Sequence, residues 1–153
     1  AKLRAIRPDI SISTDLIIGF PGETEKDFQA TIDLIERTKF DNSFSFIYSK
    51  RPGTSAAYLE DNTSEEEKKE RLSIVQKIIQ EQADIISQSM IGKQYPILIE
   101  NISKKSQQEV TGKTENCRYV SIPGNEQDIG KIVDVAITDA NRHFLKGKLL
   151  ELD

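Results

Sequence analysis

The sequence predicts a fold in two parts, an α/β part over residues 1–90 and an all-β part over residues 91–153. From Ile10 to about Met90, apolar strand-like runs alternate with segments of helical periodicity, which is typical of α/β folds. From Gln94 onward, short alternating or β-branched segments are separated by Gly, Asn and Ser, which is typical of small barrels. The boundary is expected within the stretch MIGK.

The α/β part contains the stretch TDLIIGFPGETEKDF, which predicts a strand, a tight turn and the start of a helix. The strand is expected over residues 10–19, and its continuous apolar run suits a strand covered on both faces. Pro and Gly then reverse the chain. A helix is expected over residues 25–37, begun by a capping box of Thr24 and Asp27. Its apolar face is expected to contain Phe28, Ile32 and Ile35.

A second strand is expected over residues 43–48 and a long helix over residues 64–89. The helix begins with a second capping box, Ser64 with Glu67. Its apolar side is expected to contain Leu72, Val75, Ile79 and Ile86. Two strands and two helices cannot close a barrel or cover both faces of a parallel sheet. Residues 1–90 are therefore expected to be the last part of a larger domain.

The all-β part contains five strand-like segments, which predict a small antiparallel β-barrel. They cover residues 95–102, 109–114, 118–122, 131–140 and 144–152.

Composition limits the classes of protein to consider. The chain has 153 residues and a net charge of −4, and no apolar run is long enough to span a bilayer. The N-terminal residues lack the pattern of a signal peptide, and the single Cys117 excludes an internal disulfide, so a cytoplasmic location is expected. Residues 91–153 carry nine basic and nine acidic side chains, so charge alone does not indicate a nucleic-acid partner.

Several motifs together resemble a known family. TDLIIGFPGETEKDF, FSFIYSKRPGTSAA, the long charged helix, GKTENCRYVSI and IGKIVDVAITDA are similar in order and spacing to the C-terminal half of radical S-adenosylmethionine methylthiotransferases. Within that class the chain most resembles the tRNA-2-methylthio-N6-dimethylallyladenosine synthases (the MiaB family). The resemblance extends from about Asp9 to Leu152, and GKTENCR looks like a signature of this family.

The resemblance implies the end of a partial (βα) radical SAM barrel followed by a TRAM domain, an OB-like RNA-binding barrel. It implies an enzyme that methylthiolates C2 of N6-dimethylallyladenosine beside the tRNA anticodon. The implied cofactors are S-adenosylmethionine and two 4Fe-4S clusters, and the implied partners are the tRNA anticodon stem-loop and further N-terminal domains. One cysteine cannot supply the three thiolates of a cluster. The cluster ligands are therefore expected outside this chain, and the fragment alone is expected to be inactive.

The resemblance also implies a cofactor site at the ends of the first two strands. Its expected residues are Asp15, Ile17, Gly19, Phe20, Tyr48 and Ser49, with Arg51 and Thr54 facing the substrate. A glycine there lets a flat adenine approach the backbone, and strand alternation places Asp15 on the same face as Ile17 and Gly19. The alternative is a plain strand-turn-helix junction. For the aromatic side chains Phe44, Phe46 and Tyr48, a stripe in the core is the preferred interpretation.

In the barrel, the turn of GKTENCR is the expected site of RNA contact, through Lys113, Glu115, Asn116 and Arg118. Further phosphate contacts are expected from Lys104, Lys105, Arg142, Lys146 and Lys148, and the alternative for each is an ordinary surface charge. Tyr119 is expected either to stack on an unpaired base or to lie in the core. Cys117 and His143 lack partners at ligand spacing and are interpreted as structural or incidental.

Two other functions stay open from the sequence. One is a sibling methylthiotransferase that acts on threonylcarbamoyl adenosine or on a ribosomal protein. The other is a non-catalytic RNA-binding module in which the α/β part is only a scaffold. A Cys-x3-Cys-x2-Cys motif in the coding sequence before Thr14 would decide for the enzyme.

Overall fold

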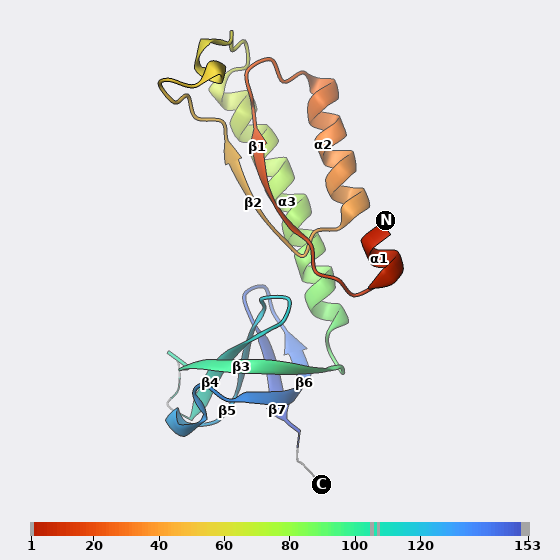
Figure 1. Cartoon of the computed structure of the whole chain (residues 1–153), viewed down its shortest axis with the longest axis vertical. Helices are drawn as coiled ribbons and strands as arrows, with labels where there is room; N and C mark the ends of the chain where they lie inside the picture. The colour runs from red at the N-terminus through yellow and green to blue at the C-terminus, as the bar shows by residue number, and fades with distance from the viewer. Residues whose placement is uncertain (1, 105, 107, 151–153) are drawn as a thin grey trace. The chain divides into compact units, whose positions relative to one another are not determined.

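A computed structural model describes residues 2–104, 106 and 108–150. The chain divides into two compact units, Ala1–Ala83 and Asp84–Asp153, called here the N-terminal unit and the barrel unit (Figure 1). The N-terminal unit contains α1 (Lys2–Ile6), β1 (Ser13–Ile18), α2 (Glu25–Thr38), β2 (Asn42–Ile47), the 3-10 turn η1 (Ser55–Tyr58) and most of α3 (Glu65–Ser89). The barrel unit contains β3 (Gln94–Ile102), β4 (Glu109–Thr114), β5 (Tyr119–Pro123), the 3-10 turn η2 (Glu126–Asp128), β6 (Ile132–Ala140) and β7 (Leu145–Leu149).

The sheet of the N-terminal unit consists of β1 and β2, which pair in parallel. Its core is one cluster of buried residues drawn from the sheet, α2, α3 and the connections: Ile18, Phe28, Ile32, Ile35, Phe40, Val75 and Ile79. The apolar face predicted for α2 is therefore confirmed. The capping box of Thr24 and Asp27 is also present, with both of its hydrogen bonds.

The opposite face of this sheet is exposed. Ile17 is 59% exposed, and Phe44 and Phe46 are 60% and 55% exposed. The predictions of a strand covered on both faces and of an aromatic core stripe are therefore wrong for these residues. The reason is that α2 and α3 contribute to a single core cluster on the other side of the strands, the side of Ile18.

The barrel unit is a closed barrel with the strand order β3-β4-β5-β7-β6. All five predicted strands are present. The predicted antiparallel barrel is present, with four antiparallel pairings and one parallel pairing, that of β5 with β7. The cause is topological: β6 returns to pair with β3, and β7 folds back along β6 and so meets β5 in the parallel sense.

The barrel core consists of inward-facing residues of all five strands together with Met90, which directly follows α3. It contains Met90, Ile97, Ile99, Val110, Val120, Ile122, Val135, Ile137, Ala140 and Leu145. Gln88 at the end of α3 donates from Nε2 to the carbonyl of Ala140 at 3.0 Å. The last turns of α3 thus belong to the barrel unit, and the chain divides after Ala83, within α3, rather than at the predicted boundary after residue 90.

Within the described part of the chain, the structure contains no helix with the length and apolar character needed to cross a membrane.

Candidate functional site

Gly19 lies directly after β1, where the chain turns away from the sheet. Its φ of +71° is in the left-handed region, and a Cβ at this position would lie 2.5 Å from Cγ of Lys68 on α3. Both the backbone conformation and the close approach of α3 therefore require glycine. The absent side chain would point toward α3, so the predicted placement of Gly19 on the exposed face with Asp15 and Ile17 is wrong. The alternation of side chains between the two faces of the strand ends at Gly19, because its φ is positive.

The turn that follows is held by a buried arginine. Gly19 N donates to Glu23 Oε2 at 3.2 Å, and Arg71 Nη1 donates to Glu23 Oε1 at 3.0 Å. The same guanidinium reaches Glu25 and Glu67 at 3.1 and 2.7 Å, and it lies over the ring of Phe28. Because Arg71 is 5% exposed and the Glu23 side chain only 10%, this pairing is shielded from water. The turn at the end of β1 is therefore fixed from α3.

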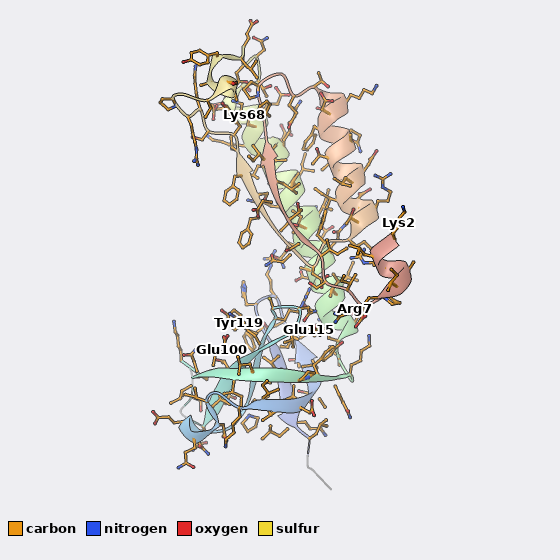
Figure 2. All side chains as sticks on the ribbon, in the orientation of Figure 1. Lys2, Arg7, Lys68, Glu100, Glu115 and Tyr119 are labelled. Carbon is orange, nitrogen blue, oxygen red and sulfur yellow. The ribbon has the colours of Figure 1, made fainter. Side chains whose placement is uncertain are left out.

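One turn earlier in α3, Lys68 is also buried, and Figure 2 labels it. Its ammonium contacts Asp61 at 2.6 Å and Glu65 at 3.0 Å. The pKa of Lys68 is raised, first by the hydrogen bond to Asp61. The sequence predicts the pair of Glu67 with Arg71, which the structure contains, but sequence reasoning missed Lys68 and the burial of both cations. Their helical spacing relative to the apolar residues Leu72 and Val75 was the available signal.

The exposed face of the sheet brings together four of the expected cofactor residues. Asp15 and Ile17 are both exposed on β1, beside Phe44 and Phe46 of β2. Beyond the strand ends, Phe20 is 43% exposed and packs edge-on against Tyr48, with ring centroids 5.2 Å apart. The Tyr48 hydroxyl is buried and has no hydrogen-bond partner among the described residues.

The remaining expected residues of the N-terminal unit lie in the loop after β2. Ser49, Arg51 and Thr54 are all exposed. The Thr54 hydroxyl donates to the carbonyl of Arg51 at 2.8 Å, which forms a local turn. This loop ends at η1.

The turn between β4 and β5 is built by hydrogen bonds within the protein. The Thr114 hydroxyl contacts Asn116 Oδ1 at 2.6 Å and accepts from Arg118 N at 3.0 Å. Asn116 Nδ2 lies 3.6 Å from Met90 Sδ, and Arg118 Nε donates to the Ser87 hydroxyl at 3.0 Å. The expected RNA-contact residue Arg118 is therefore engaged within the protein. Its guanidinium is half-buried because it joins the turn to the end of α3.

Lys113 and Tyr119 are register partners on β4 and β5. The Lys113 ammonium lies 4.9 Å from the centroid of the Tyr119 ring and 3.5 Å from Glu100 Oε2. The pKa of Lys113 is raised, first by its side-chain hydrogen bond with Tyr119 and then by the Glu100 charge. Tyr119 is 50% exposed, which excludes the core alternative for its ring.

Four other basic side chains of the barrel unit differ from Lys113, which pairs with Glu100. Lys104, Arg142, Lys146 and Lys148 are exposed, and none of them forms an ion pair with a described residue. Lys105 lies outside the described residues. Glu115, Cys117 and His143 are exposed, and no three described His, Cys, Asp or Glu residues are placed to hold a metal ion.

Comparison with known proteins identifies the barrel. Residues 88–150 match the TRAM domain. Over 148 residues, 97% of its length, the chain is 56% identical to the tRNA-2-methylthio-N(6)-dimethylallyladenosine synthase of Xylella fastidiosa strain M12. It is 53% identical over the same length to the enzyme of that name from Xanthomonas axonopodis pv. citri strain 306. The resemblance inferred from the sequence is confirmed. The chain spans about 30% of the length of these relatives, and the barrel unit is called the TRAM barrel below.

Proposed function

We propose that this chain is the C-terminal part of a radical SAM tRNA methylthiotransferase, which adds a methylthio group to C2 of N6-dimethylallyladenosine beside the anticodon. The observation that carries the proposal is the identity of 53–56% to synthases of that name over 97% of the chain. The identity includes both units, which favours the enzyme over a free-standing RNA-binding module. A tRNA substrate is consistent with a cytoplasmic location.

The N-terminal unit is assigned the end of the partial radical SAM barrel and part of the S-adenosylmethionine site. The exposed Ile17 and Phe20 fit the apolar faces of an adenine ring, and the Tyr48 ring packs edge-on against Phe20 and holds it in place. When bound together with the clusters, the cofactor supplies the radical chemistry. The residues of this chain bind and orient it, with Asp15 and Ser49 as further contacts and Arg51 and Thr54 toward the substrate. We assign the ligands of the two 4Fe-4S clusters to the remaining length of the polypeptide.

The TRAM barrel is assigned the binding of the anticodon stem-loop. Phosphate contacts are assigned mainly to Lys104, Arg142, Lys146 and Lys148, because these exposed charges lack acidic partners among the described residues. The turn residues Lys113, Glu115, Asn116 and Arg118 contribute in another way. Three of them are engaged by Glu100, Met90 and Ser87, so they hold the shape of the RNA-facing turn.

The enzymatic part of the proposal is tested with the full-length protein that contains this chain. The protein is expressed in cells that lack their own methylthiotransferase, and the nucleosides of their tRNA are separated by mass. We expect the 2-methylthio form of N6-dimethylallyladenosine. A methylthio group on threonylcarbamoyl adenosine instead, or on a ribosomal protein when the intact ribosomal proteins of the same cells are weighed by mass spectrometry, would assign the chain to a sibling enzyme.

The RNA-binding part is tested by salt titration of the chain with an anticodon stem-loop. Each lost phosphate contact lowers the slope of log affinity against log salt by roughly 0.7–0.9. The double variant Lys146→Gln, Lys148→Gln is therefore expected to lower the slope by roughly 1.5. The matched control is Lys26→Gln, Lys77→Gln, which removes two exposed charges from the N-terminal unit and is expected to leave the slope unchanged. Equal slopes for both double variants would contradict the assignment.

A further inference from the structure

A row of three exposed side chains and one partly exposed side chain, that of Lys113, crosses four strands of the TRAM barrel at one level. Ile132 on β6 pairs with Leu98 on β3, Leu98 pairs with Lys113 on β4, and Lys113 pairs with Tyr119 on β5. Ile132, Leu98 and Tyr119 are 73%, 43% and 50% exposed. Register partners point to the same side of a sheet, so the four side chains share the outer face. This row is called the outer row.

The outer row is not explained by the stability of the barrel. The adjacent residues Ile97 and Val120 are at most 1% exposed and already fill the interior. Apolar side chains that stay in water contribute little to the free energy of folding. Three large apolar or aromatic side chains in one short row on the outer face favour a surface that another molecule covers.

At one end of the row the Tyr119 ring is fixed from one side. The Lys113 ammonium lies 4.9 Å from the ring centroid and is itself held by Glu100, and Figure 2 labels Glu100 and Tyr119 on the barrel. Because Glu100 balances the charge of Lys113, this pair offers a positioned ring rather than a free cation. A planar, half-exposed ring suits stacking with another planar group.

We propose that the outer row is a stacking platform for the unpaired bases of single-stranded RNA, with Tyr119 as its principal contact. The inference rests on the RNA-binding role proposed for the barrel. In OB-like barrels, oligonucleotides bind on the face of the second and third strands, which β4 and β5 are in this barrel. Aromatic rings on such a face stack with bases of any sequence.

The neighbouring strand supplies the complementary phosphate contacts. Lys146 on β7 is the register partner of Ser121 on β5, two residues from Tyr119 on the same outer face. An RNA strand whose base lies on Tyr119 can therefore place its backbone along Lys146 and Lys148. The ring contributes a term that depends little on salt, whereas the lysines contribute a term that falls with salt. The two terms can be measured separately.

The test compares two RNAs with equal numbers of phosphates, a hairpin with a single-stranded loop and a blunt duplex. Wild type is expected to bind the hairpin about tenfold more tightly, because one stacked base contributes roughly 5- to 150-fold in affinity. Tyr119→Leu is expected to abolish this preference without changing the salt slope, and Tyr119→Phe to retain it. The matched control is Tyr58→Leu, which removes an 84% exposed tyrosine from the N-terminal unit.

A second measurement uses wild type alone and is informative even if Tyr119→Leu fails to fold. A 2-aminopurine base in the hairpin loop is expected to lose fluorescence on binding, because stacking quenches it. If the preference for the hairpin survives in folded Tyr119→Leu, or if the probe stays bright in bound wild type, the stacking role of Tyr119 is wrong. Equal binding of duplex and hairpin by wild type overturns the platform but leaves RNA binding intact. If wild type binds neither RNA, the RNA-binding function proposed for the barrel fails.

Discussion

The two units of this chain differ in their sheet edges: among the described strands, the barrel has none, whereas the two-stranded sheet of the N-terminal unit has two. In the barrel unit five strands close on themselves, so each strand has two neighbours and the inward side chains form one core. In the N-terminal unit the two described strands pair only with each other, and one face of their sheet exposes Ile17, Phe44 and Phe46. Every barrel strand finds hydrogen-bond partners and core contacts within the barrel, whereas the two-stranded sheet has core contacts on one face only.

The units also differ in what they bury. The N-terminal unit buries Asp41, Lys68 and Arg71, whereas the only buried polar residue in the described part of the barrel unit is Thr114. The buried cations of α3 hold the turn after β1 and the loop before α3 through carboxylates. The N-terminal unit is therefore stabilised by ion pairs as well as by its core, and the barrel mainly by apolar packing.

The largest effects are expected from removing core volume in each unit separately. Ile97→Ala in the barrel and Ile35→Ala in the N-terminal unit each delete a side chain that is at most 1% exposed. Each is expected to lower the stability of its own unit by about 2–5 kcal/mol. Amide hydrogen exchange, measured for each unit, follows the loss of protection. Equal loss of protection in both units for either variant would show that they unfold as one.

Removing the buried arginine is expected to affect the N-terminal unit nearly as strongly. Arg71→Met leaves the Glu23 carboxylate buried without its cation, which costs about 3 kcal/mol. The control Lys69→Met changes an exposed lysine of the same helix and is expected to cost less than about 0.5 kcal/mol. Denaturant unfolding compares the two variants. A small effect of Arg71→Met would mean that the core alone fixes the turn after β1.

Acid is expected to destabilise the N-terminal unit more than the barrel. The pKa values of Asp27 and Asp61 are lowered below the usual 3.8, chiefly by hydrogen bonds from Thr24 and Lys68 respectively. Among the described carboxyls of the barrel, only Asp128 has a lowered pKa, chiefly because of a hydrogen bond from the Asn125 backbone. A carboxyl whose pKa is lower when folded adds stability above its unfolded pKa and loses it as the pH falls through the folded value. Hydrogen exchange from pH 7 down to about 3 is expected to show earlier loss of protection in α2 and α3 than in the barrel strands. The reverse order would contradict the comparison.

The smallest effect is expected at the turn of the barrel. Cys117 has a φ of +60°, a conformation that asparagine tolerates better than most residues. Cys117→Asn is expected to raise the stability of the barrel by about 0.5–1 kcal/mol, and Cys117→Val to lower it. Thermal unfolding of both variants measures the difference. If both substitutions shift the midpoint in the same direction, backbone strain is not the cause.

Local patterns predicted the elements of the fold well. The alternation in residues 95–102 and 109–114 predicted two barrel strands, and the capping box of Thr24 and Asp27 predicted the start of α2. Alternation does not say what covers a face, so it could not show that Phe44 and Phe46 would be exposed. The parallel pairing of β5 and β7 depends on contacts distant in sequence, which periodicity does not encode.

The candidate site was predicted less completely than the fold. The sequence indicated the glycine at the end of β1, but the side chain that approaches it, Lys68, comes from a helix that begins more than forty residues later. Arg118 was expected to contact RNA because it lies at a turn between two barrel strands. Its bond to Ser87 depends on the position of the α3 end, which only the folded structure shows. Tyr119 was left between core and surface, and its exposure assigns it to the surface.

The most direct test of the account follows the backbone amides of the isotope-labelled chain by NMR while an anticodon stem-loop is added. RNA is proposed to bind the outer face of the TRAM barrel, and the cofactor is proposed to bind at the ends of β1 and β2. We therefore predict shifts for the amides of β4, β5 and β7, with Tyr119 and Lys146 among the largest, and unchanged signals from β1 and β2. Shifts concentrated in β1 and β2, or no shifts in the barrel, would contradict the assignment of RNA binding to the barrel.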